Sequence, residues 1–282
     1  MAERFIFTVA TGRCGQATFT EWVNRHVPEA YAAFEQPHAK TRLPGALGDL
    51  ERHFRRRFVE TDELLGRGRV LDAFVAGDDA YLERVAAKRI EMARRWCAAA
   101  GKSIYVDVSK FFARGLHIGF ARHLPRFGLV ILLRDPVANM RSFLNRDKNF
   151  WKDNPPTDAA RNLLRLDPKT LGKGELYLWA WCEMYLRYLA LRDSGQVTHA
   201  VEVPTRDLDH PERVAAIFRA LGLAHTPLTH VPAMNTNAEA GRGATTVMAD
   251  DVRVFERFMN RLPGDVLGRL DYLKTYRPRA AA

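Results

Sequence analysis

The stretch Phe5–Trp22, which reads FIFTVATGRCGQATFTEW, combines a strand, a glycine turn and the start of a helix. The apolar and β-branched run Phe5–Ala10 predicts a strand. Thr11–Gly15 interrupts that run, and a helical pattern resumes from Gln16 or Thr18 onward. A helix N-terminus offers unpaired backbone N–H groups and the positive end of the helix dipole. The order of these elements predicts an anion-binding turn, against the alternative of an ordinary turn that follows a strand.

Several residues of this turn suit phosphate or sulfate. Gly12 and Gly15 let the backbone adopt positive φ and approach a ligand closely, and Arg13 supplies a guanidinium fork for anionic oxygens. Thr18 can place a hydroxyl on the same anion. The turn is not a Walker A loop, because that motif needs a Gly-Lys pair at its end. The Gly-Lys-Ser at 101–103 precedes a predicted strand and lacks the partner glycine.

A second signal follows the most apolar stretch of the chain, Phe127–Leu133. A continuous apolar run of this length predicts a strand that is buried on both faces, as in a parallel sheet. A helix is predicted over 136–146, because proline favours the first helical turn. Arg134 stands at the end of the strand, and Ser142 lies two turns into the helix. We expect the two side chains to converge on one phosphate.

The two motifs, in this order and about 120 residues apart, resemble those of sulfotransferases that use 3′-phosphoadenosine 5′-phosphosulfate (PAPS). Thr11–Gly15 resembles the 5′-phosphosulfate loop, in the form with arginine that several bacterial and carbohydrate-directed branches carry. Gly15-Gln16-Ala17 stands where the family commonly has Gly-Thr-Thr or Gly-Ser-Thr. Leu133–Ser142 resembles the 3′-phosphate motif, R-[DN]-P followed by five residues and serine.

This resemblance implies a fold, an activity and a binding site. The implied fold is α/β, a P-loop-like three-layer sandwich whose mostly parallel central sheet is flanked by helices. The implied reaction moves a sulfuryl group from PAPS to a hydroxyl or amine of a small-molecule or glycan acceptor, releases adenosine 3′,5′-bisphosphate and needs no metal. The residues that the resemblance assigns to the cofactor are Gly12, Arg13, Cys14, Gly15, Gln16, Ala17, Thr18, Arg134, Ser142 and Arg242, the last from the late Gly241-Arg242-Gly243 segment.

The segment after the second predicted strand, 29–34, offers two candidates for the general base. Glu35 and His38 lie on a loop, because Pro37 biases the residue before it away from helix. The segment loosely resembles the His-Glu-Pro segment that follows the second strand of some sulfotransferases. Arg13 is the catalytic residue expected to stabilise charge on the bridging oxygen. The choice between Glu35 and His38 stays open, as does the alternative that both are loop residues without a chemical role.

A third predicted strand, Ser103–Val108, supports a rival hypothesis. Asp107 near its end is a candidate magnesium ligand, which favours an ATP-dependent small-molecule kinase; the missing Gly-Lys-Ser/Thr loop disfavours it. The same segment resembles the Tyr-Val-Glu-Thr-Ser strand of one sulfotransferase branch. In this chain Lys110 stands at a position where that branch often has histidine. The third hypothesis is a nucleotide-binding or polyanion-binding protein without catalysis.

The composition fits one domain over residues 1–282, with a helical insertion at about 45–100 that includes helices over 49–60 and 79–100. A hydrophobic content of 47% is enough for a full core, and a net charge of +10 suits a polyanionic ligand. No nucleic-acid-binding motif accompanies the basic run Arg52–Arg57, which is interpreted as a solvated helix face. Neither a signal peptide nor a membrane span is recognised, so a cytoplasmic protein is expected. The oligomeric state is left open.

The three cysteines, Cys14, Cys97 and Cys182, are odd in number and widely spaced. They form neither a disulfide framework nor a zinc pattern. Cys14 lies within the anion turn, where the helix N-terminus is expected to lower the pKa of its thiol. A fifth strand is predicted over 198–203.

Overall fold

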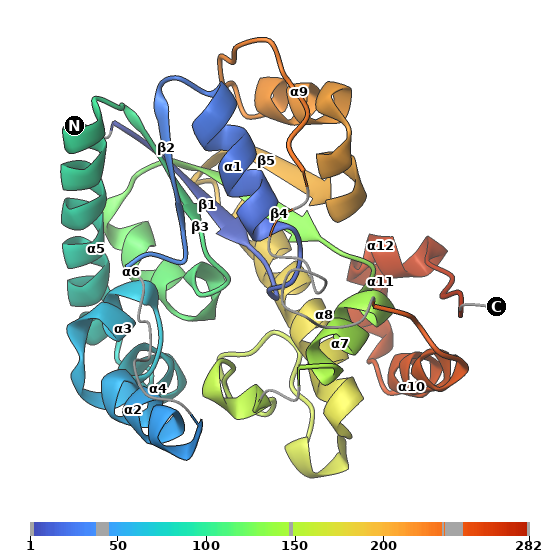
Figure 1. Ribbon diagram of the computed structural model, residues 1–282. Helices are drawn as coiled ribbons and strands as arrows, with labels where there is room; N and C mark the ends of the chain where they lie inside the picture. The colour runs from blue at the N-terminus through green and yellow to red at the C-terminus, as the bar shows by residue number, and fades with distance from the viewer. Residues whose placement is uncertain (1–2, 38–44, 147–148, 233, 235–244, 281–282) are drawn as a thin grey trace.

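The computed structural model describes residues 3–37, 45–146, 149–232, 234 and 245–280, except for the side chains of residues 45, 46, 49, 52, 56, 60 and 61. Within these residues, five strands form one sheet in the order β2-β3-β1-β4-β5, and all neighbouring strands are parallel (Figure 1). The strands are β1 (Arg4–Val9), β2 (Ala30–Phe34), β3 (Ile104–Val108), β4 (Phe127–Leu133) and β5 (Val197–Pro204). The predicted α/β class with a parallel central sheet is confirmed.

Helices connect and cover these strands. The α-helices of the described residues are α1 (Gln16–His26), α2 (Gly45–Phe58), α3 (Glu60–Leu65), α4 (Arg69–Ala76), α5 (Asp79–Ala100), α6 (Leu116–His123), α7 (Pro136–Leu144), α8 (Lys173–Arg192), α9 (Pro211–Ala220), α10 (Ala249–Met259), α11 (Gly264–Arg269) and α12 (Asp271–Thr275). Short 3-10 helices lie at η1 (Phe112–Arg114), η2 (Phe150–Lys152), η3 (Pro168–Thr170) and η4 (Thr205–Asp209). Among the described helices, none combines the length and the apolar character needed to cross a bilayer.

Each face of the sheet packs against its own set of helices, because successive side chains of a strand point to opposite faces. Ile6 of β1 joins Trp22 of α1 in one buried cluster, to which α9 also contributes. Phe7, the next residue, belongs to a second cluster with Phe120 of α6 and Leu186 of α8. The result is three layers, with the sheet between two helical layers (Figure 1).

Local sequence fixes where the two helices that matter most for the site begin. The side chain of Asp135 accepts a hydrogen bond of 2.8 Å from the backbone N–H of Ala138 and so caps α7, with Pro136 in its first turn. Asp78 caps α5 in the same way, and Gly101 with φ of 65° ends that helix. These caps define the residues at which α7 and α5 begin and at which α5 ends.

The segment between β2 and β3 contains more helices than the sequence predicts. The two expected helices appear as α2 and α5, and α3 and α4 lie between them, where no separate helix was predicted. Both end at a glycine in the left-handed region, Gly66 with φ of 95° and Gly77 with φ of 79°. Helices of six and eight residues are too short to produce a clear helical period in the sequence.

Candidate functional site

The predicted anion turn lies at the carboxyl end of β1 and leads into α1. Gly12, Arg13 and Gly15 have φ angles of 98°, 61° and 77°, so the turn follows left-handed backbone that favours glycine at two of these positions. A Cβ on Gly15 would lie 2.7 Å from Leu208 Cδ1, which shows how closely η4 packs against the turn. The N-cap residue of α1 is Gly15, which has no side chain that could cap the helix. Its first N–H groups are therefore suited to bind an anion.

Arg134 brings the second predicted motif onto this turn. β1 and β4 are parallel neighbours, so the loops that follow them meet at one edge of the sheet. The Nη1 atom of Arg134 donates a hydrogen bond of 3.2 Å to the backbone oxygen of Arg13, 121 residues earlier in the chain. Trp181 Nε1 donates 2.9 Å to the Arg134 carbonyl and fixes its backbone. Burial lowers the pKa of the Arg134 guanidinium, because the charged form loses hydration.

Asn139 on α7 ties the turn to the second motif, and sequence reasoning missed it. Its Nδ2 donates 2.9 Å to the Gly12 carbonyl, and its Oδ1 accepts 3.1 Å from Thr11 Oγ1. The side chain is 1% exposed. Asn139 precedes Ser142 by three residues, so the two share one face of α7. That spacing is the sequence signal that could have identified it.

Two buried polar atoms on these elements have no hydrogen-bond partner within the described part of the chain. They are Ser142 Oγ on α7 and Gln16 Nε2 at the start of α1. Leaving a buried donor or acceptor unsatisfied costs about 1–3 kcal/mol. A bound anion that reaches them would remove that cost. The residues present therefore fit a phosphate-bearing ligand at the meeting point of the two motifs.

Cys14 and Thr18 make contacts within the chain. Cys14 Sγ lies 3.2 Å from Thr11 Oγ1, and burial raises the pKa of the Cys14 thiol. The expected lowering of this pKa is therefore wrong, because loss of hydration outweighs the hydrogen bond from Thr11 and the positive charge of Arg134. Thr18 Oγ1 accepts 3.0 Å from the backbone N–H of Met234, which leaves the hydroxyl proton for donation elsewhere. Ala17 is half-buried in the first turn of α1.

Of the two candidate bases, Glu35 is described, whereas His38 lies outside the described residues, as does the cofactor candidate Arg242. Glu35 follows β2 directly, is half-buried and has φ of 42°. Its backbone N–H donates 3.1 Å to the Val108 carbonyl of β3. A non-glycine residue with positive φ costs about 1–3 kcal/mol, and this conformation persists only where surrounding residues stabilise it.

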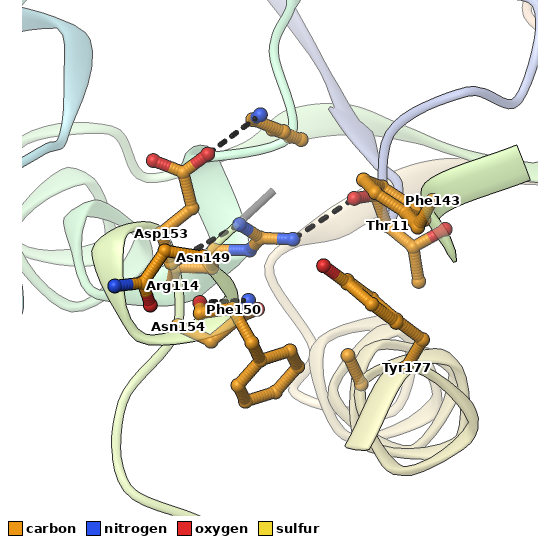
Figure 2. Close-up of a pocket in the computed structure, with 10 residues that line it drawn as sticks. Thr11, Arg114, Phe143, Asn149, Phe150, Asp153, Asn154 and Tyr177 are labelled. Atoms are coloured by element: carbon orange, nitrogen blue, oxygen red, sulfur yellow. Dashed lines mark hydrogen bonds and ion pairs between the residues drawn. The ribbon is translucent and has the colours of Figure 1, made fainter. Parts of the chain in front are cut away.

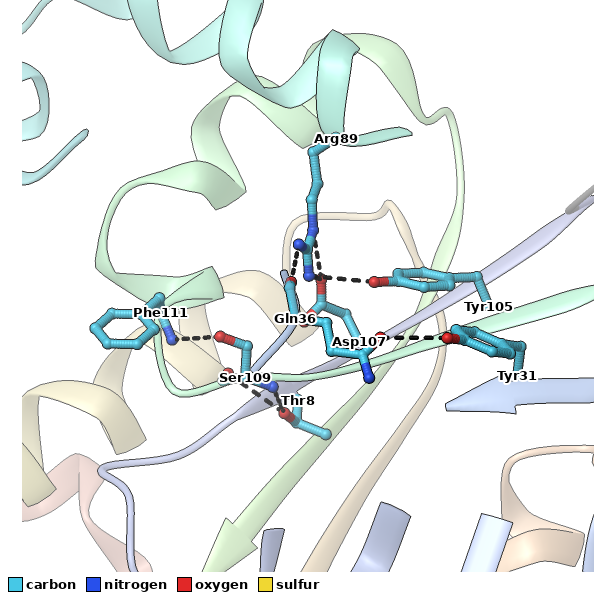
Figure 3. Close-up of polar contacts among 8 residues, drawn as sticks. All are labelled: Thr8, Tyr31, Gln36, Arg89, Tyr105, Asp107, Ser109 and Phe111. Carbon is cyan, nitrogen blue, oxygen red and sulfur yellow. Dashed lines mark hydrogen bonds and ion pairs between the residues drawn. The ribbon is translucent and has the colours of Figure 1, made fainter. Parts of the chain in front are cut away.

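Arg89 of α5 stabilises this conformation (Figure 3). Its Nη1 donates to the backbone oxygen of Gln36, next to Glu35. Its Nη2 donates 2.9 Å to Asp107 Oδ2 and 3.1 Å to the Tyr105 hydroxyl on β3. Arg89 is 1% exposed, so these contacts form in the interior. The sequence predicts a helix over 79–100 but does not single out Arg89.

Asp107 thus faces an arginine from a neighbouring helix. Its Oδ2 is shared between Arg89 Nε at 3.3 Å and Nη2 at 2.9 Å, and the carboxylate is 3% exposed. This pairing gives Asp107 a structural partner in place of the magnesium ion on which the kinase hypothesis depended. Within the described ranges, no group of three or more acidic, histidine or cysteine side chains is placed to hold a metal ion.

A pocket adjoins the turn on the side of β3 (Figure 2). Lys110 and Arg114 line it together with Asp153, whose Oδ2 lies 3.0 Å from Lys110 Nζ. Arg114 Nη2 donates 3.0 Å to the Thr11 carbonyl, and Nη1 donates 2.6 Å to the Asp153 carbonyl. The opposite wall includes Tyr177, which points toward the centre of the group in Figure 2. The pocket therefore combines cationic and aromatic surface directly beside Thr11.

Electrostatics link this pocket to the candidate base. Burial lowers the pKa of Arg114 to about 10, while the negative charges of Asp153 and Glu35 act in the opposite direction. The negative charge of Glu35 thus favours the charged form of Arg114. Arg114 was not predicted from the sequence, because an arginine before a glycine in a short helical segment looks like a surface residue.

Comparisons with known proteins add the following. No protein-family model matches the chain, and no curated protein matches its sequence. Among solved structures, the chain is similar to the sulfotransferase domain of the Synechococcus PCC 7002 olefin synthase, with 12% identity and a TM-score of 0.49, over 98% of this chain and 96% of that one. It is also similar to a sulfotransferase from Alicyclobacillus acidocaldarius, with 16% identity and a TM-score of 0.47, over 99% and 98% of the two chains.

A third similar structure is the sulfotransferase STF1 from Mycobacterium tuberculosis H37Rv, with 16% identity and a TM-score of 0.40, over 79% of this chain and 68% of that one. At these values the likenesses decide neither ligand nor activity. The function is therefore inferred from the residues of the site.

Proposed function

We propose that this protein is a PAPS-dependent sulfotransferase that transfers a sulfuryl group to a hydroxyl or amine of a small-molecule or glycan acceptor. The observation that carries the proposal is the junction between the two phosphate motifs. Arg134 bonds to the backbone of Arg13, and Asn139 bonds to Gly12, so one ligand with two anionic ends can touch both motifs. The buried hydroxyl of Ser142 supports the same ligand, because within the described chain it has no other partner.

Each motif has a defined task in this proposal. The turn from Gly12 to Gly15 and the first turn of α1 hold the 5′-phosphosulfate through backbone N–H groups. Arg134 and Ser142 hold the 3′-phosphate. PAPS, when bound, supplies the sulfuryl group and leaves as adenosine 3′,5′-bisphosphate. Arg13 stabilises the charge that develops on the bridging oxygen, as fixed cations do in phosphoryl transfer.

The acceptor enters from the pocket beside Thr11. Lys110, Arg114 and Asp153 give this pocket a charged surface, which favours a polar acceptor, and Tyr177 offers an aromatic wall. Glu35 removes the acceptor proton, and its charge acts on Arg114 at the edge of the same pocket. We also propose a cytoplasmic location, where PAPS is available as a soluble donor.

Calorimetric titration with adenosine 3′,5′-bisphosphate and with AMP tests the proposal. The two nucleotides differ only in the 3′-phosphate, for which Arg134 and Ser142 are assigned. A contact between a phosphate and a charged partner contributes about 1.5–3 kcal/mol, so the bisphosphate should bind at least about tenfold more tightly than AMP. Equal affinity for the two nucleotides, or tighter binding of ATP with magnesium, would contradict the assignment.

A further inference from the structure

Helix α2 exposes apolar side chains to solvent along one side. Leu47, Leu50, Phe54 and Phe58 are 61%, 66%, 56% and 66% exposed, which makes them the four most exposed large hydrophobic residues of the described chain. Their spacing of three, four and four residues puts them on a single face of the helix. Isolated exposed apolar residues are ordinary, but a contiguous row of four marks an interaction surface. These four side chains are called the α2 apolar face below.

The polar side chains of α2 show the reverse arrangement. Glu51 and Arg55 form an ion pair of 3.5 Å and are only 17% and 21% exposed. A helix on the surface of a globular protein normally buries its apolar side and exposes its charges. On α2 the charged pair is the more buried and the apolar face is the more exposed. The apolar face therefore contributes little to the core of this chain.

Basic residues border the α2 apolar face. Arg57, between Phe54 and Phe58 in the sequence, has a side chain that is 62% exposed, and it pairs with Asp72 of α4 at 3.2 Å. His53 is also exposed. The sequence of α2 holds four arginines against one aspartate and one glutamate, a difference of +2, within a chain of net charge +10. A partner that suits both features is apolar inside and anionic at its surface.

We propose that α2 binds the surface of an anionic lipid bilayer, with its apolar face inserted at the boundary between headgroups and acyl chains. Leucine and phenylalanine on one side with arginine beside them are typical of helices that lie in the plane of a membrane interface. Anionic headgroups attract the exposed Arg57, and the acyl chains receive Phe54 and Phe58. In Figure 1, α2 lies at the periphery of the molecule next to α3 and α4, away from the sheet.

The size of the face favours a bilayer over a second copy of the chain. Four side chains at these exposures present on the order of 500 Å², whereas each subunit of a stable dimer buries about 800 Å². Insertion of a few large side chains into lipid requires no complementary protein surface. The positive charge of α2 would also repel the same helix of a second copy.

The test is co-sedimentation of the full chain, without nucleotide, with phosphatidylcholine vesicles that either contain or lack phosphatidylglycerol. The chain should bind the anionic vesicles, and raising the salt from about 0.1 M to about 1 M should weaken binding because it shortens the screening length. Removing the two aromatic anchors in the double variant Phe54→Ser/Phe58→Ser should lower the partition coefficient at least about tenfold.

The matched control is Leu163→Ser/Met248→Ser, which removes two other exposed apolar side chains, 41% and 53% exposed, from different parts of the chain. This control should bind vesicles like the wild type. Far-UV circular dichroism of both double variants should match that of the wild type, because neither pair is buried. Absence of binding to anionic vesicles, or equal loss in both double variants, would overturn the proposal.

Two further outcomes would also overturn it. If the wild type is a dimer by light scattering and Phe54→Ser/Phe58→Ser is a monomer, the face is an interface between copies. If neutral vesicles bind as well as anionic ones at low salt, the arginines have no part in recognition. Because no nucleotide is present, each of these failures leaves the proposed sulfuryl transfer untouched.

Discussion

The carboxyl edge of the sheet has two halves that are built differently. On the half formed by β1 and β4, the turn after β1 and the start of α7 come from continuous sequence motifs, and Ser142 keeps an unsatisfied hydroxyl. On the half formed by β2 and β3, Glu35 stands in a conformation that Arg89 and Val108 support from other elements. On the first half a buried hydroxyl is left available to a ligand, whereas on the second half Arg89 joins the loop after β2 to Asp107 of β3.

This difference agrees with the task that the proposed function gives to each half. Nucleotide phosphates are the same for every donor molecule, so a short motif of glycines and one or two charged side chains is sufficient. A general base has to be placed against a particular acceptor, and its position depends on the packing of a whole helix. Mutations should therefore affect stability on the β2–β3 side and ligand affinity on the β1–β4 side.

The largest effect on stability is expected from Arg89→Met. It leaves the buried carboxylate of Asp107 without its cation, and breaking a buried ion pair in this way costs about 3–5 kcal/mol. Urea unfolding followed by circular dichroism measures this loss. The control is Arg95→Met on the same helix, whose pair with Glu91 is 3.8 Å long and about 70% exposed, and it should change stability by less than about 1 kcal/mol. Similar losses in both variants would remove the distinction between the two halves.

The next effect concerns turnover. Glu35→Gln keeps the shape of the side chain but cannot take a proton, so kcat should fall at least about a hundredfold. The affinity for adenosine 3′,5′-bisphosphate should stay within about twofold, because Glu35 is assigned to the acceptor and not to the phosphates. Glu29→Gln, an exposed glutamate just before β2, is the control. A near-normal kcat of Glu35→Gln would show that Glu35 is not the general base and would leave His38 as the candidate.

The smallest effect separates ligand binding from stability. Ser142→Ala should weaken bisphosphate binding by about 0.5–1.5 kcal/mol, the usual contribution of one hydrogen bond. It should not lower the stability of the free protein, because the Ser142 hydroxyl has no partner there within the described residues. Ser109→Ala should lower the stability of the free protein and leave bisphosphate binding unchanged, since Ser109 Oγ accepts a hydrogen bond of 3.1 Å from the Phe111 N–H. Calorimetry and thermal unfolding of the two variants measure both quantities, and the reverse pattern would rule out Ser142 as a ligand.

The fold was predictable from the sequence because its strands are short apolar runs bounded by glycine, proline or charge. β4 is buried along its whole length, and the sequence of Phe127–Leu133 contains no polar residue to obscure it. The shorter helices α3 and α4 were missed because six or eight residues give no reliable period. Their positions depend on how the segment after β2 packs, and sequence spacing does not encode that packing.

The candidate site was predictable only where its residues are consecutive or follow a family pattern. Arg13, Arg134 and Ser142 were identified in this way, and the structure places Arg13 and Arg134 in contact. Asn139 and Arg89 were missed, because a polar residue within a helical pattern looks the same whether it is exposed or buried. Both act through tertiary contacts with residues more than 50 positions away.

The central claim is that Arg134 recognises a 3′-phosphate beside the Arg13 turn, and the affinity ratio between adenosine 3′,5′-bisphosphate and AMP tests it most directly. Arg134→Ala should weaken bisphosphate binding by about ten- to a hundredfold and leave AMP binding nearly unchanged, so the ratio falls toward one. Arg25→Ala on α1, an exposed arginine paired with Glu21 at 2.8 Å, should keep the wild-type ratio. A ratio that survives Arg134→Ala in a folded protein would contradict the account.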